Sequence, residues 1–341
     1  MSKLFSEFRI KDLVLKNRIV MPPMCMYSAG GDGIITDWHP IHYASRAIGG
    51  VGLIIVEATG VCPEGRISGN DLGIWDDGHI PGLRSLVDLL HSHGAKVGLQ
   101  INHGGRKCEA PGMDIEAPSP LPFDTESKVP REMTKQDIAD TVLEFQRAAA
   151  RALAVGFDLL QVHAAHGYLL SEFLSPATNK RTDEYGGSRE NRVRMLGEVL
   201  DAVTKVWPKE KPLEVRVSAE DYVDGGNQAE DLAYMLNLVK GKGIDMVNVS
   251  TGGVVPAPPK VFPGYQVSHA QAIARVTGLP VTAGGLLTDP THIESVLADE
   301  KIELVFLGRE LLRDPYWPLR AATALEYEME WPKQYLRAKP R

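Results

Sequence analysis

The sequence contains few cysteines and no long apolar run, and both absences limit the classes of protein to which it can belong. Its cysteines, Cys25, Cys62 and Cys108, are odd in number and widely spaced. A disulfide framework is therefore not expected, and a reducing cytoplasm is the expected location. The longest apolar stretch, around residues 51–58, is too short and too broken by glycine to span a bilayer, and the N-terminus lacks the apolar core of a signal peptide. We expect no contact with a membrane.

Blocks of like charge and dedicated nucleotide-binding motifs are also missing. The chain has 37 basic and 44 acidic residues, a net charge of −7, without the clustered Lys and Arg that contact nucleic-acid phosphates. It has neither a Gly-x-Gly-x-x-Gly turn between a strand and a helix nor a Walker lysine loop. We therefore expect no nucleic acid as a partner and no dinucleotide held by a Rossmann unit.

The 341 residues, 43% apolar and 24% charged, have the composition of a globular protein with one large core. Short β-branched runs alternate with amphipathic stretches throughout. Strands are predicted at residues 18–21, 53–58, 96–102, 159–163, 213–218, 246–250, 281–283 and 304–308. Helices are predicted at residues 39–48, 81–93, 135–154, 189–206, 228–241, 267–277, 290–297 and 314–327. Eight such strand–helix units predict an α/β fold, the (β/α)8 TIM barrel.

No linker rich in proline, glycine or serine divides the chain, so residues 1–341 are expected to form a single domain. One irregular stretch, residues 106–130, is rich in proline and follows the third predicted strand. The loops after barrel strands lie on the catalytic face, so this segment is expected to form a lid or a wall of the site. Residues 328–341 are expected to form a C-terminal tail.

The most informative segment is His163-Ala-Ala-His166-Gly-Tyr168, which follows the apolar residues 157–162. A short apolar run after a glycine predicts a buried strand. Both imidazoles and the phenol then lie at the exit of that strand, and in barrels this is the end where chemistry takes place.

Three interpretations of this segment compete. His163 and His166 could be two ligands of a barrel metallohydrolase, with a third ligand such as Cys25 or His103, although no further metal motif supports this. Alternatively, two neutral imidazoles bind one carbonyl or nitro oxygen, and Tyr168 delivers a proton. The third interpretation is a buried structural cluster. The spacing alone leaves the second and third equally favoured.

A phosphate site is predicted at the last two strands. The seventh ends in Ala283-Gly284-Gly285 and the eighth in Gly308-Arg309. Barrels often bind phosphate with these two loops, where glycines let backbone N–H groups approach an anion and arginine adds charge. A mononucleotide or a sugar phosphate over the barrel mouth fits this pattern.

Ordered segments along the chain carry a resemblance to a known family, at residues 15–27, 37–43, 52–58, 100–106, 163–170, 173–176, 181–192, 308–315 and 334–337. Together they resemble the Old Yellow Enzyme family of FMN-dependent ene-reductases, and within it the bacterial NADPH dehydrogenase and xenobiotic reductase subgroup called thermophilic-like. The resemblance covers essentially the whole chain. It implies a (β/α)8 barrel that binds FMN tightly without a covalent bond and takes electrons from NADPH or NADH.

The resemblance also implies which residues bind the cofactor. Arg216 would lie beside N1 and the C2 oxygen of the flavin and stabilise negative charge there, which agrees with a charged side chain inside an apolar strand. Cys25 would tune the flavin potential and substrate binding. The other implied cofactor-binding residues are Pro22, Pro23, Met24, Ala58 and Gln100 at the ring and Ala283, Gly284, Gly285, Gly308 and Arg309 at the phosphate.

The implied substrates are activated alkenes and nitro compounds, with phenols as ligands. His163 and His166 would bind the electron-withdrawing oxygen, Tyr168 would protonate the α-carbon, and Tyr27 would contact the substrate from the opposite side. Arg337 resembles an arginine that reaches the active site of a neighbouring subunit, which implies a homodimer or homotetramer. Two departures stand out, Pro22 where many relatives have serine and the ending Ala-Lys-Pro-Arg after Arg337.

Overall fold

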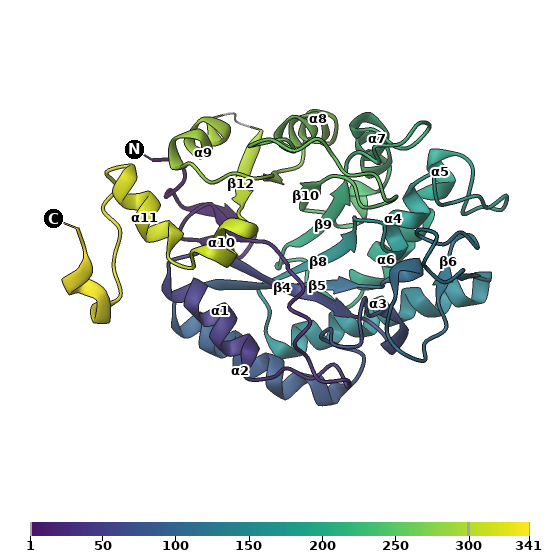
Figure 1. The fold of residues 1–341 in the computed structure, drawn as a ribbon, viewed down its shortest axis with the longest axis horizontal. Coiled ribbons are helices and arrows are strands. Elements are labelled where there is room, and N and C mark those ends of the chain that lie inside the picture. Colours follow the sequence, from purple (N-terminus) through teal and green to yellow (C-terminus); the bar gives the residue numbers. More distant parts are fainter. Residues whose placement is uncertain (1, 299–300, 341) are drawn as a thin grey trace.

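The computed structural model describes residues 2–298 and 301–340. Within these residues, eight parallel strands close into one barrel, and helices surround it (Figure 1). The barrel strands are β3 (Ile19–Met21), β4 (Leu53–Gly60), β5 (Lys96–Asn102), β8 (Leu159–Ala164), β9 (Leu213–Ser218), β10 (Met246–Ser250), β11 (Val281–Ala283) and β12 (Ile302–Phe306). The predicted (β/α)8 barrel is confirmed.

The strands are buried on both sides, as expected for a parallel sheet covered by helices. All eight residues of β4 are buried, for example. The outer helices are α1 (Trp38–Ile48), α2 (Ile80–Ser92), α3 (Lys135–Val155), α6 (Arg194–Val203), α7 (Ala229–Val239), α8 (Val267–Thr277), α9 (Pro290–Leu297) and α11 (Trp317–Ala324). Shorter helices are α4 (Leu169–Leu174), α5 (Arg189–Arg192) and α10 (Arg309–Arg313).

Helix α3 illustrates how local sequence sets these boundaries. Thr134 accepts a hydrogen bond from the backbone N–H of Asp137, whose carboxylate in turn accepts from the N–H of Thr134. This capping box starts the helix. Gly156 ends it in the left-handed conformation at φ 104°, which glycine adopts without strain. Ile138, Phe145 and other apolar residues at helical spacing face the core.

The N-terminal end of the barrel is closed by a hairpin, β1 (Phe8–Ile10) and β2 (Leu13–Leu15). Phe8, Leu13 and Leu15 pack with buried residues inside the barrel, among them Leu53 and Met246. Access from this end is therefore blocked, and the open end is the one where the strands have their carboxyl termini.

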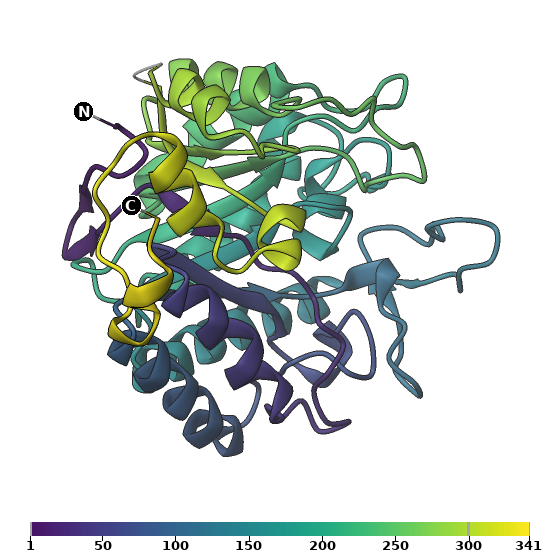
Figure 2. The same ribbon diagram turned by 60° about the vertical axis from the view of Figure 1, so that its left-hand side comes forward.

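Two segments lie outside the barrel wall. Residues 106–130 include β6 (Glu116–Ala117), which pairs with β7 (Arg131–Glu132), and this part projects away from the barrel (Figure 2). The C-terminal tail runs back along the outside and ends in a 3-10 helix, Lys333–Ala338. Over the described ranges, no helix has the length and apolar character needed to cross a bilayer.

Candidate active site

A tight turn at the end of β8 brings the two histidines and the tyrosine together. His166 and Gly167 both adopt left-handed conformations, at φ 60° and 69°. A side chain at Gly167 would lie 2.3 Å from the carbonyl oxygen of Gly253, so only glycine fits there. The ring of His163 lies 5.3 Å from that of His166 and 5.0 Å from that of Tyr168 between centroids. The predicted convergence of these side chains is therefore present in the structure.

The hydrogen bonds and burial define the protonation of the imidazoles. The backbone N–H of Ala165 donates to Nδ1 of His163 at 3.3 Å, so the neutral ring carries its proton on Nε2. Nε2 of His166 lies 2.7 Å from Oγ of Ser250. Burial lowers the pKa of both histidines well below the usual value, and the nearby charges of Arg216 and Lys107 lower it further. Two neutral hydrogen-bonding groups face the site.

Tyr168 is held in its protonated form. Burial raises the pKa of this phenol, and the charges that Cys25 and Tyr27 would carry if ionised raise it further. Burial likewise raises the pKa of Cys25, so this thiol stays protonated. Tyr27 is more than half exposed and has a left-handed backbone at φ 51°. Cys25 and Tyr27 follow β3 and Tyr168 follows β8, so the three side chains border the same space from two segments at the barrel mouth.

Arg216 is a buried cation within β9. Burial lowers its pKa to about 10, and the neighbouring carboxylate of Glu214 opposes this change, so the guanidinium is charged at neutral pH. Its Nε has no hydrogen-bond partner in the described part of the chain, and both polar atoms of the Asn248 side chain are also buried without one. Buried polar groups are rarely left unpaired in this way. They fit a polar, anionic ligand such as FMN.

A cavity of about 220 Å³ joins Arg216 to the predicted phosphate loops. It is lined by Pro22, Pro23, Met24, Arg216, Ser250, Tyr265, Gln266, Gly285, Gly308 and Arg309, together with neighbouring residues of the last two loops. Gly285 is left-handed at φ 96°, and a side chain there would meet the ring of Tyr265 at 2.8 Å. The backbone at Gly285 is therefore free to approach an anion, which fits a phosphate.

Other predicted site residues lie around this cavity rather than in its lining. Ala58 and Gln100 are buried in the neighbouring strands β4 and β5. Ala283 ends β11, and Gly284 follows it, next to Gly285. Conversely, Ser250, Gln266 and Asn248 were not predicted to belong to the site. Polar residues at the carboxyl end of an otherwise apolar strand, residues 246–250, are the signal that could have identified two of them.

Lys107, which had no role assigned from the sequence, supports the histidine turn. Its Nζ donates to the carbonyl oxygens of His166, at 3.0 Å, and Gly253, at 3.2 Å. The same ammonium lies 5.1 Å from the ring centre of Tyr168 and 4.3 Å from that of Phe123 in the projecting segment. Residues 106–130 therefore contact the candidate site through Lys107, and Phe123 of the same segment packs against that ammonium.

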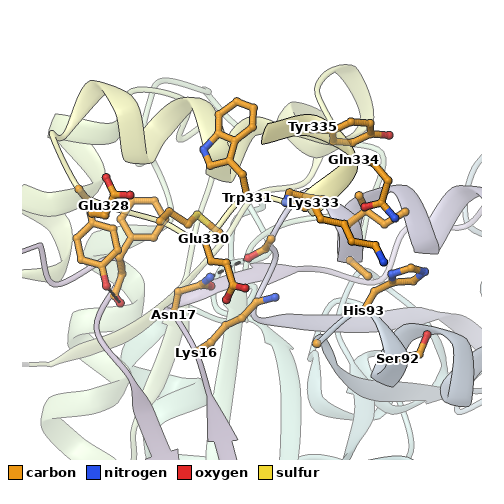
Figure 3. A pocket seen from close by; sticks show the side chains of 18 residues that line it. Lys16, Asn17, Ser92, His93, Glu328, Glu330, Trp331, Lys333, Gln334 and Tyr335 are labelled. Carbon is orange, nitrogen blue, oxygen red and sulfur yellow. Dashed lines mark hydrogen bonds between the residues drawn. The ribbon is translucent and has the colours of Figure 1, made fainter. Parts of the chain in front are cut away.

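A larger cavity of about 830 Å³ lies elsewhere, between the C-terminal tail and the N-terminal ends of the strands (Figure 3). Lys16, Asn17 and His93 line it from the barrel, and Trp331 and Tyr335 line it from the tail. None of the three predicted catalytic residues lines it. Arg337 is exposed on the tail, on the outside of the barrel, so the structure does not bring it to His163 of its own chain.

The interpretation of His163 and His166 as metal ligands requires a third ligand. Among residues 2–298 and 301–340, no group of three or more His, Cys, Asp and Glu side chains is arranged to hold a metal ion. His103 is buried, and its Nδ1 accepts a hydrogen bond from the N–H of Gly105.

Comparison with known proteins agrees with this geometry. Residues 3–328 match the family described as NADH:flavin oxidoreductase / NADH oxidase. An NADPH dehydrogenase of Geobacillus thermodenitrificans (strain NG80-2) is 56% identical over 335 residues, which is 98% of each chain. Morphinone reductase, at 27% identity, has a TM-score of 0.83 over 97% of this chain and 92% of its own. An Old Yellow Enzyme homologue from Zymomonas mobilis, at 26% identity, has a TM-score of 0.82 over 99% of each chain.

None of these relatives supports a metallohydrolase, and all agree with the resemblance to the Old Yellow Enzymes. The cofactor and reductant expected from that resemblance, FMN and NAD(P)H, agree with them as well. The chain belongs to the NADH:flavin oxidoreductase / NADH oxidase family and is an FMN-dependent oxidoreductase.

Proposed function

We propose that the protein is an ene-reductase that reduces the activated C=C bond of α,β-unsaturated carbonyl or nitro compounds. The observation that carries this proposal is the pair of neutral, buried imidazoles, His163 and His166, with the protonated Tyr168 beside them. A protonated phenol beside two neutral imidazoles can serve as the general acid that protonates a carbanion whose charge is delocalised onto the bound oxygen.

The residues that would hold FMN come from several barrel strands and from the segments that follow them at the open end of the barrel. Residues 22–25 and Ala58 would line the ring, and Gln100 would bind its pyrimidine end. Arg216 would lie beside N1 and the C2 oxygen, and residues 283–285, Gly308 and Arg309 would bind the phosphate. When bound, FMN would supply hydride transfer from a nicotinamide to the β-carbon of the substrate.

The protein's own side chains would perform the remaining chemistry. Nε2–H of His163 and the ring of His166 would donate to the carbonyl or nitro oxygen and stabilise the charge that develops there. One such donor placed in advance contributes about 3–4 kcal/mol in comparable sites. Tyr168 would give its proton to the α-carbon, and Tyr27 would cover the substrate from the opposite side.

Phe123 and Lys107 support a role for residues 106–130 as a wall of the site, within a single domain formed by residues 1–341. Arg337 is exposed, and the 3-10 helix Lys333–Ala338 that carries it lies on the outside of the barrel. We infer that the protein is a homodimer or homotetramer in which this arginine reaches a neighbouring active site, and that it acts in the cytoplasm.

The first test is an anaerobic visible spectrum of the purified protein. A flavin band that bleaches on addition of NADPH and returns with cyclohexenone supports the cofactor, the reductant and the reaction together. A colourless protein that does not take up FMN would contradict the proposal.

A further inference from the structure

Inside the barrel, one layer below His163, four polar side chains from four strands form a continuous chain of hydrogen bonds. Nε2 of Gln100 donates to Oε1 of Gln161 at 2.6 Å, and Nε2 of Gln161 donates to Oε2 of Glu214 at 2.6 Å. Oγ1 of Thr282 donates to the other carboxylate oxygen, Oε1, at 3.0 Å. Gln100 and Gln161, like Gln161 and Glu214, are partners in the strand register.

This chain occupies a place where barrels usually have apolar side chains. All four residues are at most 1% exposed. Side chains of Val, Ile and Leu dominate such layers, and burying an amide or a carboxylate costs free energy unless it is paired. A buried chain with a carboxylate at one end therefore suggests a function other than packing.

The carboxylate sets the direction of the whole chain. An ionised Glu214 can only accept hydrogen bonds, so Gln161 must turn its NH2 group toward it. The amide oxygen of Gln161 then faces Gln100, which must present its own NH2 group in turn. Without that terminal acceptor, both amides could exchange their oxygen and nitrogen positions.

The charge needed for this ordering is favoured by the same neighbours. Burial raises the pKa of Glu214, and the hydrogen bonds from Gln161 and Thr282 and the nearby Arg216 oppose that rise. Glu214 in turn raises the pKa of Arg216. Glu214, at the end of this relay of hydrogen bonds, and Arg216, the cation of the candidate site, therefore stabilise each other's charged forms.

The result is a defined polar edge at Gln100. Among the described residues, the hydrogen bond that the Gln100 side chain makes is the one from Nε2 to Gln161, which leaves Oε1 and one N–H of the NH2 group for a ligand. An acceptor beside a donor is the complement of a ring edge in which an N–H lies next to a carbonyl group. The pyrimidine end of a flavin carries such an imide.

We propose that Glu214, acting through Gln161, is a positioning residue that keeps the amide oxygen of Gln100 turned toward the cofactor, so that the site selects a ring with a free imide N–H. This inference rests on the proposed function, because it takes FMN to be bound with its pyrimidine end at Gln100. Neither Glu214 nor Gln161 would touch the cofactor itself.

The test measures cofactor selectivity rather than activity. Holoenzyme is equilibrated with equal excess concentrations of FMN and 3-methyl-FMN, in which a methyl group replaces the imide hydrogen. The bound flavins are then released and quantified by mass spectrometry. Glu214→Gln keeps the size of the side chain but removes the acceptor-only end of the relay. Glu184→Gln, which makes the same substitution at an exposed carboxylate outside the barrel, is the matched control.

Wild type and Glu184→Gln should prefer FMN over its methylated analogue to the same extent, within about twofold. Glu214→Gln should lower this preference by about tenfold, the effect of one hydrogen bond. Gln161→Met, which interrupts the relay at its centre, should lower it similarly and provides an independent variant if Glu214→Gln does not fold. Unchanged preference in a folded relay variant would overturn this inference and leave the proposed function intact. Failure of the wild type to bind FMN at all would instead overturn the proposed function.

Discussion

The backbone N–H of Ala165 donates to Nδ1 of His163, which places the imidazole proton on Nε2 and makes that nitrogen a hydrogen-bond donor. Burial keeps this ring neutral. The donor is therefore in place before any substrate arrives and needs no proton uptake to function. Such preorganised donors contribute most where charge develops during the reaction.

His163→Ala should therefore weaken the binding of phenols, whose oxygen occupies the place proposed for the substrate oxygen. We expect the affinity for a phenol such as 4-hydroxybenzaldehyde to fall by about 100-fold, from the loss of one strong donor. The measurement is a titration followed by the long-wavelength band that phenols give with oxidised flavin. His91→Ala, on the surface and hydrogen-bonded to Asp158, is the control and should bind phenols normally. Equal affinity in wild type and His163→Ala would exclude the oxyanion role.

Tyr168→Phe separates the two halves of the reaction. The phenol is proposed to act only in protonation of the substrate, so alkene reduction should slow by about 100-fold or more. Reduction of bound FMN by NADPH should change less than about twofold. Rapid-mixing absorbance of the flavin, with NADPH and with cyclohexenone in separate experiments, measures both. A parallel loss in the two halves would show that Tyr168 supports the site as a whole rather than donating the proton.

Arg216→Met should make FMN harder to reduce and weaken its binding. The buried guanidinium has no partner for its Nε among the described residues and is charged at neutral pH. Its loss removes the positive charge proposed to stabilise electrons on the ring. The midpoint potential, measured by equilibration with a reference dye, should become more negative. Arg216→Lys should lie between wild type and Arg216→Met, because it keeps the charge but not the planar fork of donors. A potential that does not move in Arg216→Met would place this residue away from the ring.

The parts of the site that could be predicted from the sequence are those with a local or chemical signal. His163, His166 and Tyr168 share one turn, and Arg216 is a charge in an apolar strand. By contrast, the contact of His166 with Ser250 joins residues 84 positions apart. The relay from Gln100 to Glu214 depends on strand register. Neither leaves a pattern along the chain, because closure of the barrel creates both.

Elements of the fold could likewise be predicted where the sequence has a clear hydrophobic pattern and were missed where it has none. The barrel strands were predicted within a few residues, since alternation of apolar runs and amphipathic stretches is a strong signal. Helix α4 was missed, because six residues that are all buried have no amphipathic period. The helix predicted at 189–206 is two helices, α5 and α6, divided at Val193. The N-terminal hairpin was also missed, since its strands have three residues each.

Glu172 gives the last prediction, which concerns stability. This carboxyl group is fully buried one turn after Tyr168 and accepts a hydrogen bond from the N–H of Arg106 at 2.9 Å through Oε1. Its Oε2 has no partner within residues 2–298 and 301–340. Burial raises the pKa of Glu172 to about 8, against an ordinary value near 4.5, although Arg106 and Lys107 oppose this rise.

Because the folded pKa lies above the unfolded one, the folded protein binds more protons between about pH 4.5 and 8. The contribution of Glu172 is complete below this range and is lost as the pH rises through it. Glu172→Gln cannot ionise and should lose less stability as the pH rises. Between pH 5 and pH 8.5, its unfolding free energy should therefore increase relative to that of wild type by a few kcal/mol, on the order expected for such a shift. Urea denaturation of both proteins at the two pH values measures this difference. Glu184→Gln, at the surface, should follow wild type at both values. If Glu172→Gln and wild type lose stability equally with rising pH, the carboxyl group is already ionised in the folded protein at pH 5, and Lys107 and Arg106 outweigh its burial.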